Sequence, residues 1–332
     1  MTGTDEVDPS PAPDTITART RARYVVERDR LGRTVDRLRD TSSFVDSLVR
    51  AWEYDSEIGG GLMAGALAFR LFMFMVPFTV FSFALLATIG DLLNRAPREM
   101  ADRAGIGGIL ADGIVNVNTM SSTSRYLLLA ITGYAMVFAS RTVIRTIVDA
   151  YCLIWRMPRL RMKRTRAGLI LIGFVMIYGY LSTALGRLRS VAPAPGLALT
   201  VAAIAVPLLA WLWASAVLPH GDAPAWALIP GTVTFAIGVE AIHLFTVYWV
   251  AHEVTAKSET YGVIGISLTV LLWAYIVGRL VTGTAVVNAV LWRRFEETHP
   301  EELEALHGGA ATSESRTRLA LAWIRSAAGL FR

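Results

Sequence analysis

The sequence has a single cysteine in 332 residues and few charged side chains. One thiol, Cys152, cannot form an intramolecular disulfide, and it rules out a cysteine-rich metal site within the chain. Charged residues make up 18% of the sequence, whereas soluble domains carry about 25%. Hydrophobic residues make up 54%. This composition excludes a disordered chain, a secreted disulfide-rich domain and an ordinary cytosolic enzyme, and it favours a membrane protein.

The sequence also lacks the short motifs of common enzyme chemistries. It has no Gly-x-x-x-x-Gly-Lys phosphate loop and no Gly-x-Ser-x-Gly nucleophile elbow. The acidic residues within 296–304 are typical of a solvated helix face rather than of a nuclease metal site. We therefore expect no enzymatic activity, no cofactor and no nucleic-acid partner. The five histidines include no metal-binding His-x-His or His-Glu-x-x-His pair: His220, His243, His252, His299 and His307.

Long apolar runs dominate the sequence instead. A transmembrane helix needs about 20 mostly apolar residues, and six runs reach that length. The pattern predicts an all-α, polytopic bundle of six transmembrane helices within residues 59–295, with Pro77, Pro207 and Pro230 as bend points. The six expected spans are residues 62–90, 126–155, 167–186, 197–218, 226–250 and 262–292.

Both ends of the chain are predicted to lie outside the spans. Residues 1–40 are polar and rich in arginine and proline, which is typical of a disordered basic tail. Residues 41–58 and the tail at 296–332 each contain an amphipathic segment, suited either to the membrane interface or to packing on the bundle. The apolar faces are Phe44, Val45, Leu48, Val49 and Trp52 in the first segment, and Leu319, Ala320, Trp323, Ile324, Ala327, Leu330 and Phe331 in the second.

The basic residues are distributed unequally between the two sides of the predicted bundle. With the N-terminus inside, the inner segments hold 21 of the 32 basic residues and the outer segments hold 7. The loop at 156–166, with six of them, lies closest to span ends. Because basic residues concentrate in cytoplasmic loops, both termini are predicted to be cytoplasmic. The outer segment 91–125 is expected to form a short amphipathic helix.

Seven ionisable side chains fall inside the predicted spans, where charges are costly and usually mark a partner or a pathway. Five of them lie in one layer, roughly 12 to 20 Å from the inner end of their helices at about 1.5 Å per residue. Four are arginines, and only two carboxylates accompany them. The seven are Arg70, Arg141, Arg145, Asp149, Glu240, His243 and Arg279.

Two interpretations of these charges remain open. Arg141, Arg145 and Asp149 follow an i, i+4, i+8 spacing and form a stripe on one helix face. If the four arginines faced a common interior, about two positive charges would need water, carbonyls or an anionic ligand, and arginine suits phosphate or carboxylate. The alternative is that Arg70, Arg141 and Arg279 pair with Glu240, Asp149 and helix carbonyls to fix packing. Arg145 would then extend to the inner membrane surface. His243 is expected to serve packing.

Several segments resemble the YihY/BrkB family of bacterial inner-membrane proteins. They cover about residues 50–300 and are GGGLMAGALAFRLFMFMVPF at 59–78, DAYCLIWR at 149–156, AVLPH at 216–220, the span that begins APAWALIPG, and YGVIGISLTVLLWAYIVGRLVTGTAVVNAVLW at 261–292. The resemblance implies six helices with both termini cytoplasmic. Many members carry a Gly-Ala-Glu-x-Asn-like sequence in the last span, whereas Gly283, Val286 and Asn288 stand here without the acid.

The resemblance implies little about function, because members of that family were once labelled as a ribonuclease and some are proposed to export anionic lipids or other envelope components. We expect a transporter or flippase-like protein of the bacterial plasma membrane for an anionic lipid or small anion. Its binding layer would consist of Arg70, Arg141, Arg145, Arg279, Glu240 and His243. The alternative is a scaffold whose basic segments bind anionic lipid or a partner. Membrane lipids are the expected partners, and the sequence is compatible with a homo-oligomer.

Overall fold

The computed structural model describes residues 42–96, 98–100, 109–158, 170, 172–173, 196–245, 251–300 and 319–324. The regular elements among these residues are all helical. The chain divides into two units, one of residues 1–50 with 311–332 and one of residues 51–310. The predicted tail at 1–40 and the predicted span at 167–186 lie almost entirely outside the described residues. The all-α prediction is confirmed for the described part.

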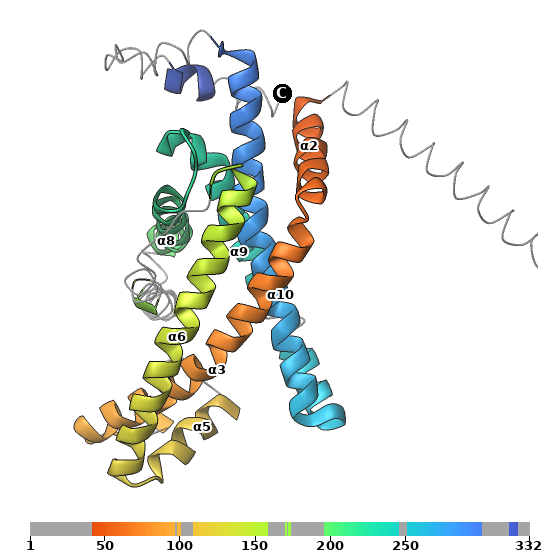
Figure 1. Ribbon diagram of the computed structural model, residues 1–332. Helices are drawn as coiled ribbons and strands as arrows, with labels where there is room; N and C mark the ends of the chain where they lie inside the picture. Colours follow the sequence, from red (N-terminus) through yellow and green to blue (C-terminus); the bar gives the residue numbers. More distant parts are fainter. Residues whose placement is uncertain are drawn as a thin grey trace, which may run out of the picture. The chain divides into compact units, whose positions relative to one another are not determined.

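Three long helices build the larger unit (Figure 1). They are α3 (Gly60–Leu92), α6 (Ser122–Ile154) and α10 (Ala251–Thr298). Helix α3 packs against both α6 and α10. The shared core is apolar and includes Leu67 and Phe74 of α3, Val143 of α6 and Val281 of α10. A charge on any of these helices is therefore either on the outside of this core or requires a partner within it.

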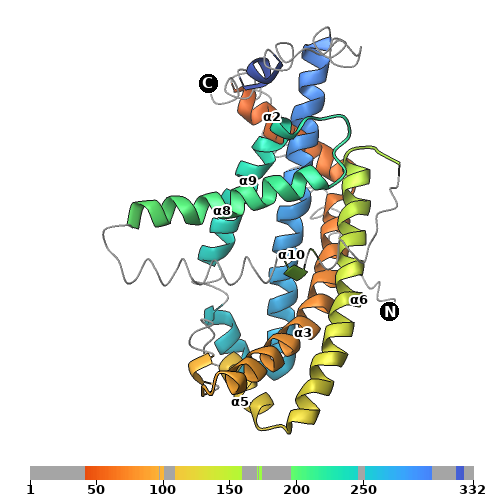
Figure 2. The same ribbon diagram turned by 90° about the vertical axis from the view of Figure 1, so that its left-hand side faces the viewer.

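Within the described residues, four helical segments are long and apolar enough to cross a membrane: Gly60–Leu92, Ser122–Ile154, Ala225–Ile242 and Ser267–Thr298. They correspond to four of the six expected spans. A fifth expected span forms α8 (Gly196–Val217), of which Ala205–Val217 counts as a shorter apolar helix. Figure 2 shows α8 running across the direction of α10 rather than along it. The count of six spans therefore stays a prediction.

The second group of helices is built around a short turn. The 3₁₀ turn η1 (Ala225–Leu228) leads directly into α9 (Ile229–Phe245), which packs against α8 and α10. Pro230 was expected to bend a span, but it lies in the first turn of α9, where a missing N–H leaves no hydrogen bond unmade. By contrast, Pro77 and Pro207 lie inside helices α3 and α8.

Helix α10 is longer than the sequence pattern suggested. Residues 251–261 were expected to be a loop, yet they form its first turns, and the helix continues for 48 residues. At 1.5 Å per residue it is about 72 Å long, more than twice the roughly 30 Å of a bilayer core. It ends at Thr298, shortly before Pro300, since proline disfavours a helical conformation in the preceding residue.

The expected amphipathic helix of segment 91–125 is present as α5 (Ile109–Asn118), which packs against α3. Ile114 and Val117 are buried against Ala84 and Ala87 of α3. At the same end of the helices Arg125 forms an ion pair with Asp91. Its Nη1 also donates to Asn118 Oδ1 at 3.1 Å. These contacts join α3, α5 and α6 at the end that the arginine distribution predicts to be external.

The segment predicted to be an interfacial helix forms α2 (Ser43–Glu57). Two of its apolar residues, Leu48 and Trp52, are 57% and 69% exposed, whereas Tyr54 and Asp55 at its C-terminal end are buried. Helix formation is thus confirmed, and contact with lipid stays a prediction. In the tail, residues 319–324 are helical, with Leu319 and Trp323 buried and Ile324 exposed.

Candidate functional site

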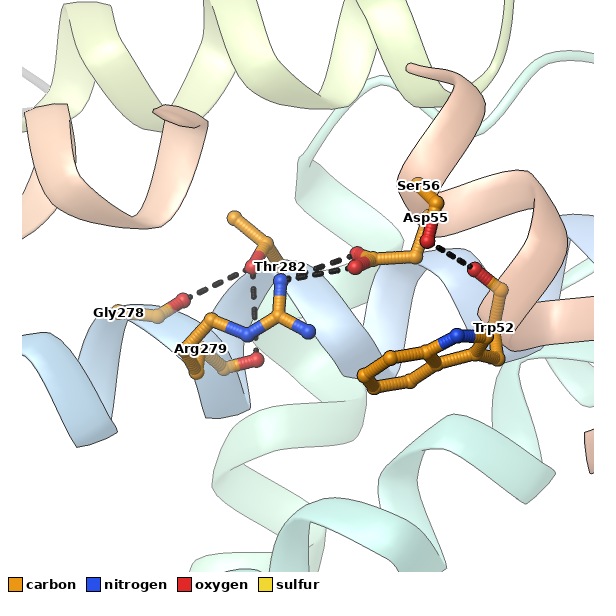
Figure 3. A network of polar contacts seen from close by, with 6 residues as sticks. All are labelled: Trp52, Asp55, Ser56, Gly278, Arg279 and Thr282. Atoms are coloured by element: carbon orange, nitrogen blue, oxygen red, sulfur yellow. Dashed lines mark hydrogen bonds and ion pairs between the residues drawn. The ribbon is translucent and has the colours of Figure 1, made fainter. Parts of the chain in front are cut away.

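The central feature of the larger unit is an ion pair between Arg279 of α10 and Asp55 of α2 (Figure 3). Arg279 Nη1 lies 2.9 Å from Asp55 Oδ2 and donates a hydrogen bond to Oδ1 at 3.2 Å. The Asp55 side chain is 12% exposed and that of Arg279 is 29% exposed. The pair joins residues 224 positions apart in the sequence, so it fixes the end of α2 against the middle of α10.

Glycines allow the chain to bring these two residues together. Between α2 and α3, Gly59 has φ of 71°, a left-handed conformation in which glycine avoids the strain of a side chain. A methyl group on Gly60 would overlap the Asp55 carboxyl group. On α10, a methyl group on Gly278 would lie 2.7 Å from the Ala64 carbonyl oxygen. The helices α3 and α10 therefore touch backbone to backbone beside Arg279.

Arg279 uses only some of its side-chain N–H donors. Both contacts with Asp55 involve Nη1, whereas a guanidinium group carries five N–H donors on three nitrogens. Among the described residues, no protein group accepts a hydrogen bond from its Nε or Nη2. A half-buried arginine inside the bundle thus retains three N–H donors for a further acceptor.

The other predicted site residues are not gathered around this pair in the described part of the chain. Arg141 and Arg145 are exposed on α6, on the side away from its buried Ser140 and Val143. Arg145 Nε lies 3.6 Å from Asp149 Oδ2, one turn along the same helix, and both side chains are substantially exposed. The stripe predicted from the spacing is present, and it faces away from the core shared with α3.

Arg70 is exposed on α3, and Glu240 is exposed on α9. Within the described residues neither has an ion-pair partner, so the expected pairing of Glu240 with an arginine is not seen there. His243 belongs to α9, and its side chain lies outside what the structure describes. Whether Arg70, Arg141, Arg145, Arg279, Glu240 and His243 act together stays a prediction.

Asp55 is the residue that sequence reasoning missed. It precedes the first span, so it was assigned to a surface helix and was not counted among the intramembrane charges. The signal that could have found it is local, because an acidic residue stands four positions before a glycine run at the start of an apolar helix. Adding Asp55 supplies Arg279 with a counterion. Of the four arginines predicted to lie within spans, Arg70 and Arg141 then have none among the described residues.

Asn288, singled out in the sequence, has a structural contact. Its Oδ1 accepts a hydrogen bond of 2.7 Å from the Gly231 backbone N–H. Gly231 lies in the first turn of α9, where backbone N–H groups have no partner within the helix. Asn288 is 3% exposed, so it caps α9 from inside the bundle. The contact anchors α9 to α10.

A family model described as "Virulence factor BrkB" matches residues 55–307. The chain belongs to the BrkB family. The match begins at Asp55 and includes Arg279. It also covers the four helical segments of the described part that are long enough to cross a membrane. Together these findings identify an integral membrane protein. No curated protein and no solved structure matches this BrkB chain.

Proposed function

We propose that this BrkB protein moves an anionic amphiphile or a small anion across the bacterial plasma membrane, with both termini cytoplasmic. The observation that carries the proposal is the state of Arg279. Its guanidinium group lies half-buried among apolar helices and keeps three N–H donors unused among the described residues. Arginine binds phosphate and carboxylate through such paired donors, so the substrate class is anionic.

The position of Asp55 supports exchange of the counterion of Arg279 rather than permanent pairing between the two residues. A buried charge needs compensation at all times, and here a carboxylate from α2 provides it. Helix α2 lies outside the apolar spans and is connected to α3 through the left-handed Gly59. An anionic group could replace Asp55 at Arg279 while α2 moves about this glycine, so the positive charge would never be left unpaired.

The arginines on the exposed helix faces extend the proposed pathway. Arg70 on α3 and Arg141 and Arg145 on α6 are exposed in the described structure. We assign them the role of attracting the anion within the membrane, together with Glu240 and His243 as polar neighbours on α9. Charged side chains at this depth are costly unless they serve a pathway or a partner.

Transport in reconstituted vesicles tests this proposal. Vesicles would contain fluorescent phosphatidylglycerol or phosphatidylcholine, and transfer between leaflets would be followed by chemical quenching. We expect Arg141→Gln to slow phosphatidylglycerol transfer at least roughly tenfold, equivalent to about 1.4 kcal/mol of lost stabilisation. Arg50→Gln is the control, because Arg50 is exposed on α2 and pairs with Asp46 on the same helix.

A scaffold function predicts a different pattern. Deletion of residues 1–40 would then abolish function in cells, whereas a transporter should largely keep its transfer rate in vesicles. Transfer by Arg141→Gln at the unmodified rate, with equal yield of folded protein, would contradict the role assigned to Arg141.

A further inference from the structure

A second cluster of cationic side chains surrounds the C-terminal end of α6. The Ile154 carbonyl oxygen accepts hydrogen bonds from Tyr54 Oη at 2.6 Å and from Arg293 Nη2 at 2.7 Å. Carbonyls in the last turn of a helix have no partner within it, so side chains of α2 and α10 satisfy this one. The contact places Arg293 directly at the point where the apolar helix α6 ends.

Arg156 follows the end of α6 in an unusual backbone conformation. Its φ is 53°, in the left-handed region. The Met157 N–H donates to the Cys152 carbonyl at 2.8 Å, and the Arg156 N–H donates to the Leu153 carbonyl at 3.1 Å. This is the Schellman pattern of helix termination, in which the left-handed position is usually glycine. An arginine here is strained, and such strain often accompanies function.

The two arginines share one aromatic ring. The guanidinium carbon of Arg293 lies 4.5 Å from the centre of the Tyr54 ring, and that of Arg156 lies 5.5 Å from it. The separation of the two guanidinium carbons is therefore no greater than the sum of these two distances. Arg156 Nη2 also lies 3.6 Å from Glu57 Oε1, in a pair whose two side chains are 62% and 68% exposed. Among the described residues, no carboxylate pairs with Arg293, so the cluster has an excess of positive charge.

We propose that Arg156 and Arg293 together bind the phosphate group of an anionic phospholipid. Arg156 lies two residues beyond α6, an apolar helix long enough to cross a membrane, and the ends of such helices lie near the headgroups of the lipids. Leu153, one turn before Arg156, is 54% exposed and offers apolar surface to an acyl chain. The Arg156 guanidinium group is free to exchange exposed Glu57 for phosphate, while Arg293 stays fixed by Ile154.

The role of this site in transport rests on the proposed function, because the lipid would bind here first, at the end predicted to face the cytoplasm. Binding itself is measured without transport. Failure of the site would leave the role of Arg279 intact, and failure of transport would leave lipid binding at Arg156 measurable.

Native mass spectrometry of the full-length protein with added dioleoyl phosphatidylglycerol tests the site. Arg156→Gly is the decisive variant, because glycine accepts the left-handed conformation without strain while the guanidinium group is removed. We expect an unchanged or higher unfolding temperature together with a roughly tenfold or greater loss of phosphatidylglycerol affinity, the effect of losing one charged hydrogen bond. Arg50→Gln should retain the affinity of the unmodified protein.

Three outcomes would overturn the proposal. The first is an Arg156→Gly protein that binds phosphatidylglycerol as tightly as the unmodified protein. The second is equal binding of dioleoyl phosphatidylethanolamine, which has no net charge. The third is displacement of the lipid by inorganic phosphate at equal concentration, which would assign the site to free phosphate instead.

Discussion

An Asp55→Asn protein with Arg279 unchanged is expected to be strongly destabilised. The substitution leaves the guanidinium group of Arg279, 29% exposed, without its carboxylate inside an apolar bundle. Removing one partner of a buried ion pair typically costs about 3–5 kcal/mol, and the residual exposure of Arg279 favours the lower part of that range. We expect a clear decrease in unfolding temperature in detergent, measured by tryptophan fluorescence.

The double variant Asp55→Asn/Arg279→Gln separates loss of the charge pair from loss of packing. Its two amides are neutral, so it should recover most of the stability lost in Asp55→Asn. Glu57→Gln is the matched control on the same helix. Its partner Arg156 is exposed, and exposed ion pairs contribute at most about 1 kcal/mol. Equal destabilisation by Asp55→Asn and Glu57→Gln would show that the Asp55–Arg279 pair is not buried as described.

Gly278→Ala is expected to force α3 and α10 apart. The added methyl group would meet the Ala64 carbonyl oxygen at 2.7 Å, and a backbone atom cannot move aside as a flexible side chain can. Overpacking of this kind costs about 1–3 kcal/mol. Because Arg279 is the next residue, we also expect weaker pairing with Asp55 in this variant.

Gly283→Ala, on the same helix, is expected to have the opposite effect on stability. No atom of the described residues lies within 4 Å of a methyl group placed there, and alanine is favoured over glycine inside a helix by about 0.5–1 kcal/mol. The unfolding temperature should therefore fall for Gly278→Ala and stay equal or rise for Gly283→Ala. A shift of the same sign and size for both would contradict the close approach of the helices.

The sequence predicts those helices whose formation depends on the pattern of neighbouring residues. Four expected spans are long apolar helices, and α5 carries the predicted helix of segment 91–125. The loop expected at 251–261 was wrong because polar residues there suggested the end of a span. A helix continues through polar residues when their helix propensity is sufficient, and α10 continues through this segment without a break.

The candidate site was harder to predict. Residue spacing shows which side chains share a helix face, but it does not show whether that face is buried or exposed. The stripe of Arg141, Arg145 and Asp149 exists, yet only packing with α3 decides which side of α6 is buried. Arg279 was recognised as an intramembrane charge. Its partner Asp55 was not, since the pairing itself depends on the turn at Gly59 and on a contact across 224 positions.

In the proposed function, the positive charge of Arg279 binds the anion while it crosses the membrane. The most direct measurement compares transfer rates of phosphatidylglycerol by the unmodified protein and by Asp55→Asn/Arg279→Gln in vesicles, with equal amounts of folded protein. We expect the double variant to remain folded and its transfer rate to fall at least roughly tenfold. A folded double variant that transfers phosphatidylglycerol at the unmodified rate would contradict it.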